Sequence, residues 1–383
     1  MTRKVITVAL NGVTGRMGYR QHLVRSLLSI REQGGVPLGD GTALYPELVL
    51  VGRSEERLRR IAERHGLDRW TTSLDEVLAD PAVEVYFDAQ VTSAREASLL
   101  KAIEAGKHVY TEKPVATSLD GALRLARAAK AAGITHGVVH DKLFLPGVLK
   151  LQRLLSAGFF GRVLSFRLEF GYWVFEGDEI PAQRPSWNYR ADEGGGIVLD
   201  MFPHWQYLLE DLFGPITALY ARQATHVPQR WDEAGRPYEV TADDAAYAVL
   251  EFASGAFASV NSSWAVRVNR RELVELQVDG TNGSAVAGLR NCAVQHRATT
   301  PMPVWNPDLP DPIDYPAQWA DVPDNMTFGN AFKVQWELFL AAAAEGRQVP
   351  WGLAEGARGV QLASLALQSS AEGRRIEVPP LDV

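Results

Sequence analysis

The stretch VITVALNGVTGRMG (5–18) decides the fold of the first third of the chain. Its apolar run VITVAL has the length and composition of a buried β-strand. The run leads into Gly12, Gly15 and Gly18, a GxxGxxG spacing, and a helical pattern begins at about Met17. Glycines at such a turn allow a pyrophosphate to approach the N-terminus of the helix closely. Because the spacing differs from the common GxGxxG fingerprint, a plain strand-to-helix turn is the alternative. The residues expected to contact a dinucleotide here are Gly12, Thr14, Gly15, Arg16, Met17 and Gly18.

The residues up to about position 142 repeat this alternation of short apolar runs and amphipathic helical patterns. Continuous apolar strands separated by helices are typical of a parallel sheet covered on both faces. The stretch REQGGVPLGDGTALYP (31–46) interrupts the pattern, and we expect an inserted loop there with no assigned role. The expected strands are 5–10, 47–52, 83–89, 107–112 and 135–140, and the expected helices after the first are 54–66, 94–106 and 119–133.

The pattern changes near residue 160, where longer strands dominate. Several of them alternate polar and apolar residues, as expected for an antiparallel sheet with one covered face. Residues 296–327 are proline-rich and irregular. The expected strands are 162–173, 216–226, 245–252, 256–266 and 272–280, and two closing helices are expected at 329–345 and 354–370. The pattern therefore predicts an α/β domain over 1–142 and an α+β domain over 143–383, whose final helices are able to pack back on the first domain.

Composition excludes several classes of protein. Hydrophobic residues make up 46% and charged residues 22% of the 383 positions, which is ordinary for a globular protein of about two domains. A net charge of −7 without a basic run argues against a nucleic-acid partner. Cys292 is the only cysteine, which fits a reducing compartment, and we expect a cytoplasmic protein. No apolar stretch reaches the ~20 residues that cross a bilayer, and the scattered histidines without an HExxH motif predict no metal site.

The end of the second expected strand indicates which dinucleotide is bound. An NAD enzyme usually offers an acidic residue here for the ribose hydroxyls, whereas this chain has Arg53 and Ser54. An arginine makes a forked, charge-assisted contact with a 2′-phosphate. We therefore expect NADP to be preferred over NAD, with both residues in contact with it. The alternative is that Arg53 only begins the charged helix SEERLRR.

Two further motifs carry side chains suited to catalysis. Glu112-Lys113-Pro114 directly follows the strand KHVYT, and GGGIVLDMFPH (194–204) contains Asp200 and His204. Asp200 and His204 are four positions apart, so on a helix they share one face. The glycines before them let the backbone pass close to a cofactor or substrate. The alternative is a solvated helix face with an incidental pair.

In this order and spacing, the glycine turn, AGKHVYTEKP (105–114) and GGGxxxDxxxH resemble the Gfo/Idh/MocA family, the glucose–fructose oxidoreductase and inositol 2-dehydrogenase family. The likeness extends over nearly the whole chain. It implies a Rossmann domain followed by a domain with a large open-faced, mainly antiparallel sheet. It also implies bound NAD or NADP and a sugar, cyclitol or derivative as substrate. By this likeness Thr92, Glu112 and Lys113 border the cofactor, and Lys113, Asp200 and His204 face the reacting carbon.

The chemistry of these residues agrees with hydride transfer to or from a carbon that bears a hydroxyl group. A neutral histidine such as His204 suits the role of acid and base near neutral pH. Lys113 polarises the substrate oxygen and stabilises developing negative charge, and Asp200 orients the imidazole or holds a hydroxyl. Two rival hypotheses remain: glycosidase chemistry that uses a tightly held NAD, and a cofactor-binding sensor without turnover.

Several positions depart from the family pattern. An aspartate commonly follows the histidine by three residues, and here that position is Tyr207. A TPNxxH loop is replaced by QVTSAR (90–95), and an NxR motif by His140-Asp141-Lys142. His140 and Lys142 are candidates for the substrate pocket, and a local ion-paired strand end is the equal alternative.

Aromatic and polar residues gather just before the glycine run. Flat aromatic faces and hydrogen-bonding groups are the usual lining of sugar sites, so Tyr172, Trp187 and Asn188 are substrate-side candidates. A loop packed on the sheet by its aromatics is the alternative. The family often pairs the open sheet face between subunits, and the resemblance therefore implies a homodimer or homotetramer.

Overall fold

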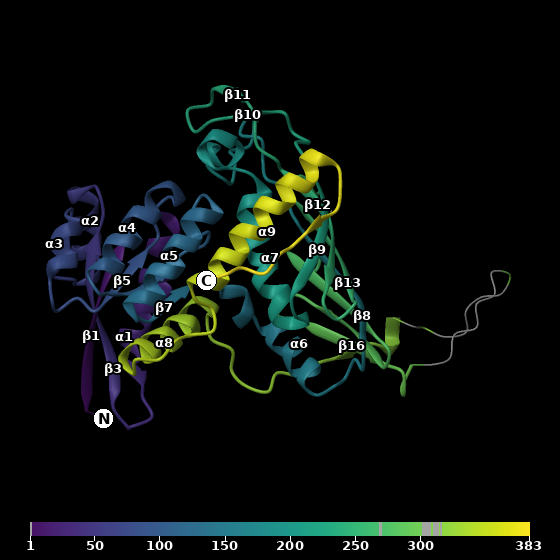
Figure 1. The fold of residues 1–383 in the computed structure, drawn as a ribbon, viewed down its shortest axis with the longest axis horizontal. Coiled ribbons are helices and arrows are strands. Elements are labelled where there is room, and N and C mark those ends of the chain that lie inside the picture. Colours follow the sequence, from purple (N-terminus) through teal and green to yellow (C-terminus); the bar gives the residue numbers. More distant parts are fainter. Residues whose placement is uncertain (1, 268–269, 301–307, 309–313, 315) are drawn as a thin grey trace. The chain divides into compact units, whose positions relative to one another are not determined.

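Two units, each with its own sheet, make up the chain in a computed structural model that describes residues 2–267, 270–300, 308, 314 and 316–383 (Figure 1). Unit 1 comprises Met1–Phe144, Gly329–Ser364 and Leu381–Val383, and unit 2 comprises Leu145–Phe328 and Leu365–Pro380. No helix in the described ranges is long and apolar enough to span a bilayer.

The sheet of unit 1 is parallel apart from one short edge strand. Its order is β2-β3-β1-β5-β6-β7, and β4 pairs with β3. The strands are β1 (Arg3–Asn11), β2 (Val36–Pro37), β3 (Ala43–Val51), β4 (Trp70–Thr71), β5 (Val85–Asp88), β6 (His108–Thr111) and β7 (His136–Val138). The helices are η1 (Gly18–Leu28), α1 (Ser29–Glu32), α2 (Glu55–His65), α3 (Leu74–Ala79), α4 (Thr92–Glu104), α5 (Leu119–Ala132), η2 (Asp141–Phe144), α8 (Ala331–Ala344) and the first part of α9 (Leu353–Glu372).

Both faces of this sheet are covered, as its continuous apolar strands predict. Tyr86 and Val109 point to one face and belong to a core formed with α3, α4, α5 and the first turns of α9. Phe87 and Tyr110, one position further along the same strands, face the other way. Their rings lie 5.0 and 4.7 Å from that of Trp336 in α8.

Local signals in the sequence fix the ends of the covering helices. The hydroxyls of Ser54 and Ser118 cap the N-termini of α2 and α5 by accepting backbone N–H groups. Gly66 and Gly133 end the same two helices in the left-handed conformation, which glycine adopts without steric cost. The ends of these two helices therefore lie close to the positions that the alternation of patterns predicts.

The segment 31–46 is not simply a loop, and that expectation is wrong. Val36 and Pro37 form β2, which pairs antiparallel with Leu44 and Ala43. As a result β3 begins at Ala43, four residues before the expected start at 47. The insertion thus widens the sheet of unit 1 by one short edge strand.

Unit 2 is built on a nine-stranded mixed sheet with the order β17-β16-β15-β14-β8-β13-β12-β9-β18. Neighbouring strands in this sheet pair antiparallel, except β8 and β13, which pair parallel. The strands are β8 (Val163–Gly171), β9 (Ile216–Ala224), β12 (Ala245–Phe252), β13 (Phe257–Ser263), β14 (Val274–Gly280), β15 (Gly283–Ala287), β16 (Cys292–His296), β17 (Ala320–Asp321) and β18 (Ile376–Glu377). A separate hairpin joins β10 (Gln229–Trp231) to β11 (Pro237–Glu239). Part of the proline-rich segment, 301–307, 309–313 and 315, lies outside the described residues.

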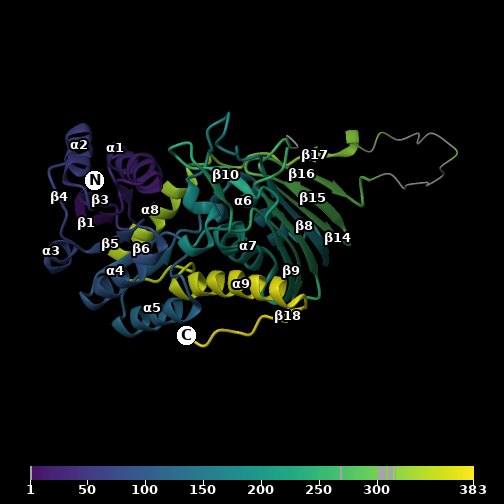
Figure 2. The same cartoon turned by 90° about the horizontal axis from the view of Figure 1, so that it is seen from above.

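Helices α6 (Pro146–Ser156) and α7 (Ile197–Phe213) lie on one face of this sheet (Figure 2). Trp205 of α7 is fully buried there, and its indole N–H donates to Ser262 Oγ of β13 at 2.8 Å. Strand β12 alternates buried and exposed residues, so its outward side chains form part of an uncovered face. The large hydrophobic side chains that are exposed on the described strands of the sheet are Leu164, Tyr220, Tyr247, Val249 and Phe257.

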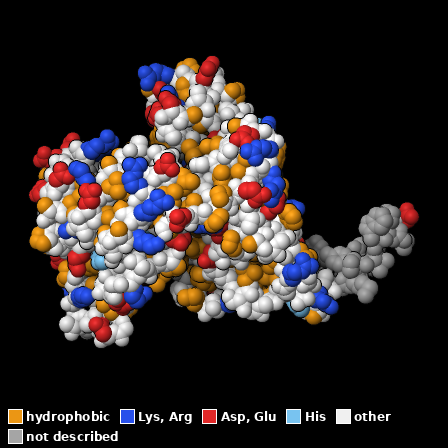
Figure 3. Space-filling view, in the orientation of Figure 1, with side chains coloured by type: hydrophobic (Ala, Val, Ile, Leu, Met, Phe, Trp, Pro, Cys, Tyr) orange, Lys and Arg blue, Asp and Glu red, His pale blue; other side chains and the backbone are white. Residues whose placement is uncertain are grey.

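Charged side chains of both signs are interspersed on the face that Figure 3 shows. This distribution agrees with a modest net charge of −7. A clustered basic surface, which nucleic-acid binding requires, is not a feature of that face.

Candidate active site

The glycine turn after β1 is closely packed, which explains why glycines occupy it. Gly12 has φ of +83°, and a Cβ added there would lie 2.5 Å from the backbone carbon of Ala89. A Cβ on Gly18 would lie 2.5 Å from the carbonyl oxygen of Gly12. The N–H of Gly15 donates to that same oxygen at 3.0 Å. The turn is therefore fixed by close backbone contacts that larger residues would prevent.

The helix after the turn begins with the α-helical residues Arg16 and Met17, and it continues from Gly18 as the π-helix η1 and then as the α-helical turn α1. Its first turn holds no acidic residue, and no side chain of the described residues caps it. The first backbone N–H groups of a helix lack partners within that helix and attract anions. The residues present therefore fit a pyrophosphate, which would meet the N-terminus of η1 beside Gly15 and Met17.

The end of β3 carries the two residues expected to select the cofactor. Arg53 is exposed and lies two residues before the start of α2. Ser54 is the N-cap of α2, and its hydroxyl accepts the N–H of Arg57 at 3.4 Å. Ser54 thus has a structural role that does not depend on a ligand.

A buried polar chain lies beneath the end of β5. Asn11 Nδ2 donates to the hydroxyl of Tyr86 at 2.8 Å, and that hydroxyl donates to Asp88 at 2.8 Å. Arg95 of α4 pairs with the same carboxylate at 3.2 Å. Burial raises the pKa of Asp88, and the Arg95 guanidinium opposes that effect. Arg95 also donates to the carbonyl of Pro114, so it ties the start of α4, where Thr92 lies, to the Glu-Lys-Pro segment.

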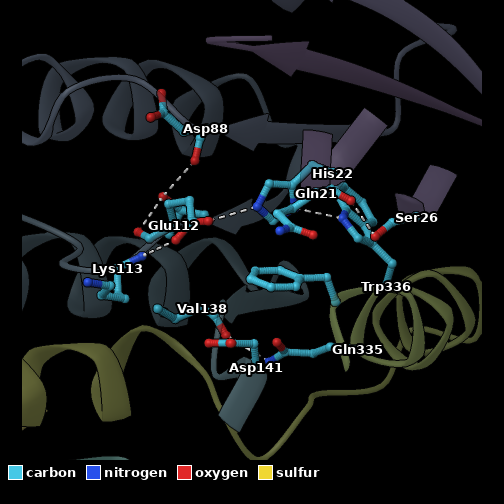
Figure 4. Close-up of polar contacts among 12 residues, drawn as sticks. Gln21, His22, Ser26, Asp88, Glu112, Lys113, Val138, Asp141, Gln335 and Trp336 are labelled. Carbon is cyan, nitrogen blue, oxygen red and sulfur yellow. Dashed lines mark hydrogen bonds and ion pairs between the residues drawn. The ribbon is translucent and has the colours of Figure 1, made fainter. Parts of the chain in front are cut away.

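Glu112 is held by a chain of donors that comes from distant parts of the sequence (Figure 4). Its Oε1 lies 2.8 Å from His22 Nε2, and Trp336 Nε1 lies 3.0 Å from His22 Nδ1. An indole nitrogen only donates, so Nδ1 of His22 accepts and Nε2 carries the proton to the carboxylate. Burial raises the pKa of Glu112, but the hydrogen bond from His22 and the charge of Lys113 outweigh it, and the pKa is lowered. Glu112 is therefore an ionised carboxylate, and its Oε2 also accepts the backbone N–H of Lys113 at 3.3 Å.

The candidates after β7 lie close together in unit 1. The backbone N–H of His140 donates to Gln335 of α8 at 2.9 Å, and burial lowers the pKa of the His140 imidazole to about 3. Lys142 Nζ lies 3.4 Å from Asp141 Oδ2. A local ion pair at the strand end, one of the two readings of this motif, is therefore present.

In unit 2, the run Gly194–Gly196 brings the start of α7 close to its own chain. A Cβ on Gly195 would lie 2.5 Å from the carbonyl oxygens of Trp187 and Asn188, and one on Gly196 would lie 2.5 Å from Asp243 Oδ1. Gly196 has φ of +117°. These contacts give Gly195 and Gly196 a structural reason that does not depend on a ligand.

Asp200, in the first turn of α7, is linked to the preceding aromatic segment. Arg184 Nη1 donates to Asp200 Oδ2 at 2.9 Å and to Asn188 Oδ1 at 3.0 Å. Arg184 Nε donates to the hydroxyl of Tyr172 at 3.2 Å. Three of the expected site residues of unit 2 thus meet at one guanidinium. Trp187 lies in the same segment, with 44% of its surface exposed.

His204 is buried one turn further along α7. Its Nδ1 lies 2.7 Å from the hydroxyl of Tyr207. The residue that departs from the family pattern therefore occupies the position of a hydrogen-bond partner to the imidazole. Helix α7 brings Asp200, His204 and Tyr207 together, whereas Lys113 belongs to unit 1.

A cavity of about 430 Å³ lies elsewhere in unit 2, between residues 177–186 and the hairpin of β10 and β11. Arg184, Trp231 and Glu233 are among its lining residues, but Asp200 and His204 are not. The cavity therefore does not mark the candidate catalytic pair. No cluster of three or more histidine, cysteine or acidic residues that would hold a metal ion occurs in the part of the chain that the structure describes.

Comparison with known proteins supports the assignment of both units. Residues 6–140 match the oxidoreductase family with an NAD-binding Rossmann fold, and residues 148–286 match the GFO/IDH/MocA C-terminal domain. A D-xylose dehydrogenase of Paenarthrobacter nicotinovorans is 56% identical over 381 residues, which are 98% of each chain. The chain belongs to the Gfo/Idh/MocA family of oxidoreductases. It is an NAD-binding enzyme of that family.

Other members of the family share the fold at lower identity. A levoglucosan dehydrogenase of Pseudarthrobacter phenanthrenivorans is 27% identical over 258 residues, 64% of this chain and 65% of that protein. The solved structure of a levoglucosan dehydrogenase in complex with NADH and L-sorbose superimposes with a TM-score of 0.81 at 24% identity and covers 100% of both chains. The predicted α/β architecture, a Rossmann unit followed by a mainly antiparallel sheet, is confirmed by this likeness.

Sequence reasoning missed four residues that organise these groups: His22, Arg95, Arg184 and Trp336. Each acts through a partner at least seven positions away in sequence, and the longest separation, from His22 to Trp336, is 314 positions. Arg95 and Arg184 carried usable signals, because Arg95 lies in QVTSAR (90–95), which departs from the family pattern, and Arg184 lies in the aromatic and polar segment before the glycine run.

Proposed function

We propose that the protein is an NAD(P)-dependent sugar dehydrogenase that transfers a hydride between nicotinamide and a carbon-bound hydroxyl or carbonyl of an aldose such as D-xylose. The observation that carries this proposal is the 56% identity to a D-xylose dehydrogenase across 98% of both chains. A levoglucosan dehydrogenase of the same fold, solved with NADH and L-sorbose, also has a sugar bound. Cyclitols and other sugar derivatives are the remaining candidates.

The residues of unit 2 have the chemistry that this reaction needs. Oxidation of an alcohol requires a base for the hydroxyl proton, and a neutral His204 accepts it at Nε2. Tyr207 fixes the imidazole through Nδ1. When Nδ1 carries the ring proton, the hydroxyl of Tyr207 accepts it and Nε2 keeps its lone pair. Asp200, oriented by Arg184, holds the substrate beside the base.

The residues of unit 1 supply charge and cofactor binding. NAD(P), when bound, accepts or supplies the hydride. Lys113 follows an ionised Glu112 that His22 holds in place, and its ammonium group stabilises negative charge on the reacting oxygen. In this proposal unit 1 is the dinucleotide-binding domain and unit 2 the substrate and assembly domain.

NADP is proposed as the preferred cofactor. The glycine turn and the uncapped N-terminus of η1 suit the pyrophosphate of either dinucleotide. At the end of β3 the exposed side chain is a cation, Arg53, rather than a carboxylate. A guanidinium favours a ribose 2′-phosphate and offers no acceptor for ribose hydroxyls.

A homodimer or homotetramer is proposed through the uncovered face of the sheet in unit 2. Tyr220 and Val249 lie opposite each other on β9 and β12, and both are more than a third exposed. Phe257 on β13 is 54% exposed. Exposed apolar side chains gathered on one sheet face are typical of a protein–protein interface.

Initial-rate assays with a sugar panel test the function. The panel contains D-xylose, levoglucosan, myo-inositol and an aryl xyloside, each with NAD and with NADP, and formation of reduced cofactor is followed by absorbance. We expect D-xylose to reduce the cofactor with the highest kcat/KM. Cofactor that binds but is reduced by no member of the panel would contradict the proposal, and cleavage of the xyloside without net reduction would favour glycosidase chemistry.

A further inference from the structure

Arg184 is held by contacts on several sides. Its Nε and Nη1 donate to Tyr172, Asn188 and Asp200 at 3.2, 3.0 and 2.9 Å. The guanidinium carbon also lies 4.2 Å from the centre of the Trp264 ring, which is fully buried. These contacts fix the plane of the guanidinium group, so little side-chain entropy remains to be lost when it binds a ligand.

One nitrogen of this group is left for another partner. Arg184 Nη2 donates to none of the residues that the structure describes, and it is not among the buried atoms that lack a partner. The side chain as a whole is 20% exposed. A guanidinium that is fixed in place and presents an accessible N–H pair is suited to bind an oxygen acceptor.

We propose that Arg184 is a substrate-binding residue that determines specificity, because its Nη2 donates to one hydroxyl oxygen of the sugar beside Asp200. This inference rests on the proposed sugar substrate. A hydroxyl oxygen accepts from Nη2 and can donate in turn to a carboxylate, so it matches the paired charges of Arg184 and Asp200. A protonated amino group has no lone pair to accept this bond and meets the positive guanidinium. The site therefore selects a hydroxyl over an amino group at one carbon of the sugar.

The alternative is that Arg184 only organises the segment around Asp200. In that case replacement of Arg184 weakens the binding of every sugar to the same extent, because no particular hydroxyl depends on Arg184. Direct binding makes a different prediction. The effect of the replacement and the effect of removing one hydroxyl are then non-additive, since either change removes the same hydrogen bond.

The experiment measures the Kd of D-xylose and of its 2-deoxy, 3-deoxy and 4-deoxy analogues by calorimetry on the protein loaded with NADPH. The proteins are the wild type, Arg184→Lys, and Arg190→Lys as the matched control. Arg190 has a similar setting, with an aromatic ring at 4.5 Å and a carboxylate at 3.6 Å, but it has no proposed substrate contact. Far-ultraviolet circular dichroism and the Kd of NADPH verify that each variant is folded.

For the wild type we expect one deoxy analogue to bind on the order of tenfold more weakly than D-xylose, the usual worth of a hydrogen bond to a charged group. The Arg184→Lys variant should bind D-xylose more weakly than the wild type does, by a similar factor. It should bind that one deoxy analogue no more weakly than it binds D-xylose. Arg190→Lys should bind all four sugars as the wild type does. The 2-amino, 3-amino or 4-amino sugar that matches the sensitive position should bind the wild type more weakly than the deoxy analogue.

Equal losses of affinity for all four sugars in Arg184→Lys would overturn the inference, and so would Kd values that are unchanged from the wild type. If the variant fails to fold, the wild type alone decides: the inference fails if every deoxy analogue binds as tightly as D-xylose, and stands if one deoxy and its amino counterpart are selectively weakened. Failure of the proposed function is read separately, from the absence of cofactor reduction by the wild type. Sugar binding and sugar oxidation can thus fail independently.

Discussion

Trp336 donates its indole N–H to Nδ1 of His22, and this contact decides which nitrogen of His22 carries the proton. The imidazole is fully buried, and its other nitrogen lies 2.8 Å from Glu112. A buried carboxylate is stable only when donors surround it. His22 and Trp336 therefore keep Glu112 ionised next to Lys113, although they come from η1 and α8 at opposite ends of the chain.

Replacement of His22 should destabilise unit 1 in a pH-dependent manner. His22→Leu removes a hydrogen bond to a charged group, which costs roughly 1.5–3 kcal/mol. In the wild type the pKa of Glu112 is lowered from 4.5, so its stabilising contribution is present above pH 4.5 and is lost as the pH falls through the lowered pKa. In His22→Leu, only the charges of Lys113 and Arg95 still oppose the effect of burial on Glu112, and the variant should be less destabilised at acidic pH than at neutral pH.

Denaturant unfolding of His22→Leu and the wild type at several pH values measures this difference. His22→Gln is the matched control, because its amide nitrogen still reaches toward Glu112. It should be destabilised less than His22→Leu. A loss of stability in His22→Leu that is the same at neutral and acidic pH would show that Glu112 is not the group concerned.

Arg53 should govern the choice between the two dinucleotides. Arg53→Ala should weaken the binding of NADP by about tenfold or more, which corresponds to roughly 1.5–3 kcal/mol for a hydrogen bond to a charged group. It should leave the binding of NAD almost unchanged. Arg64→Ala, at the other end of α2, is the control and should change neither Kd. Calorimetric titration gives both constants. A wild type that binds NAD more tightly than NADP would reject the preference.

The uncovered sheet face should hold subunits together. Val249→Asp places a charge between Tyr220 on β9 and Ser259 on β13, and it should shift the protein from an oligomer to monomers in light scattering. Leu338→Asp is the control, because Leu338 is 48% exposed on α8 and should not affect assembly. A wild type that is monomeric at micromolar concentration would contradict this assignment.

Tyr207 should act on the reaction through His204. Tyr207→Phe removes the hydrogen bond to Nδ1 and should lower kcat by up to about tenfold, as expected for one hydrogen bond of about 1 kcal/mol. KM for the sugar should change little, because the hydroxyl does not contact the substrate in this account. Equal rates of sugar oxidation for Tyr207→Phe and the wild type over the whole pH range would exclude a positioning role.

The sequence predicted those features that depend on local pattern. The glycine turn, the parallel strands and the helices with serine and glycine caps follow from short-range rules, and they lie close to the expected positions. The short strand β2 was missed because two residues carry no periodicity. Helix α6 was also missed, although Pro146 at its start and the apolar spacing after it are readable signals.

The candidate site was only partly predictable. Asp200 and His204 could be named as candidates because their spacing on one helix is local information. The partners that hold Asp200 and Glu112, Arg184 and His22, were missed because their contacts join segments separated by loops or by most of the chain. Tyr207 was noted as a departure from the family pattern, and only the structure shows it beside the imidazole.

The most direct test of the account is the steady-state rate of D-xylose oxidation across pH for the wild type, His204→Asn and Lys113→Ala. The wild-type rate should rise through the pH range in which histidines titrate, because the base must be neutral to accept a proton. His204→Asn should leave the Kd of the cofactor unchanged. Its steady-state rate should fall by on the order of 10²- to 10⁴-fold, the contribution of a positioned acid or base. Lys113→Ala should also be slowed. Near-wild-type rates in both variants would contradict the proposed chemistry.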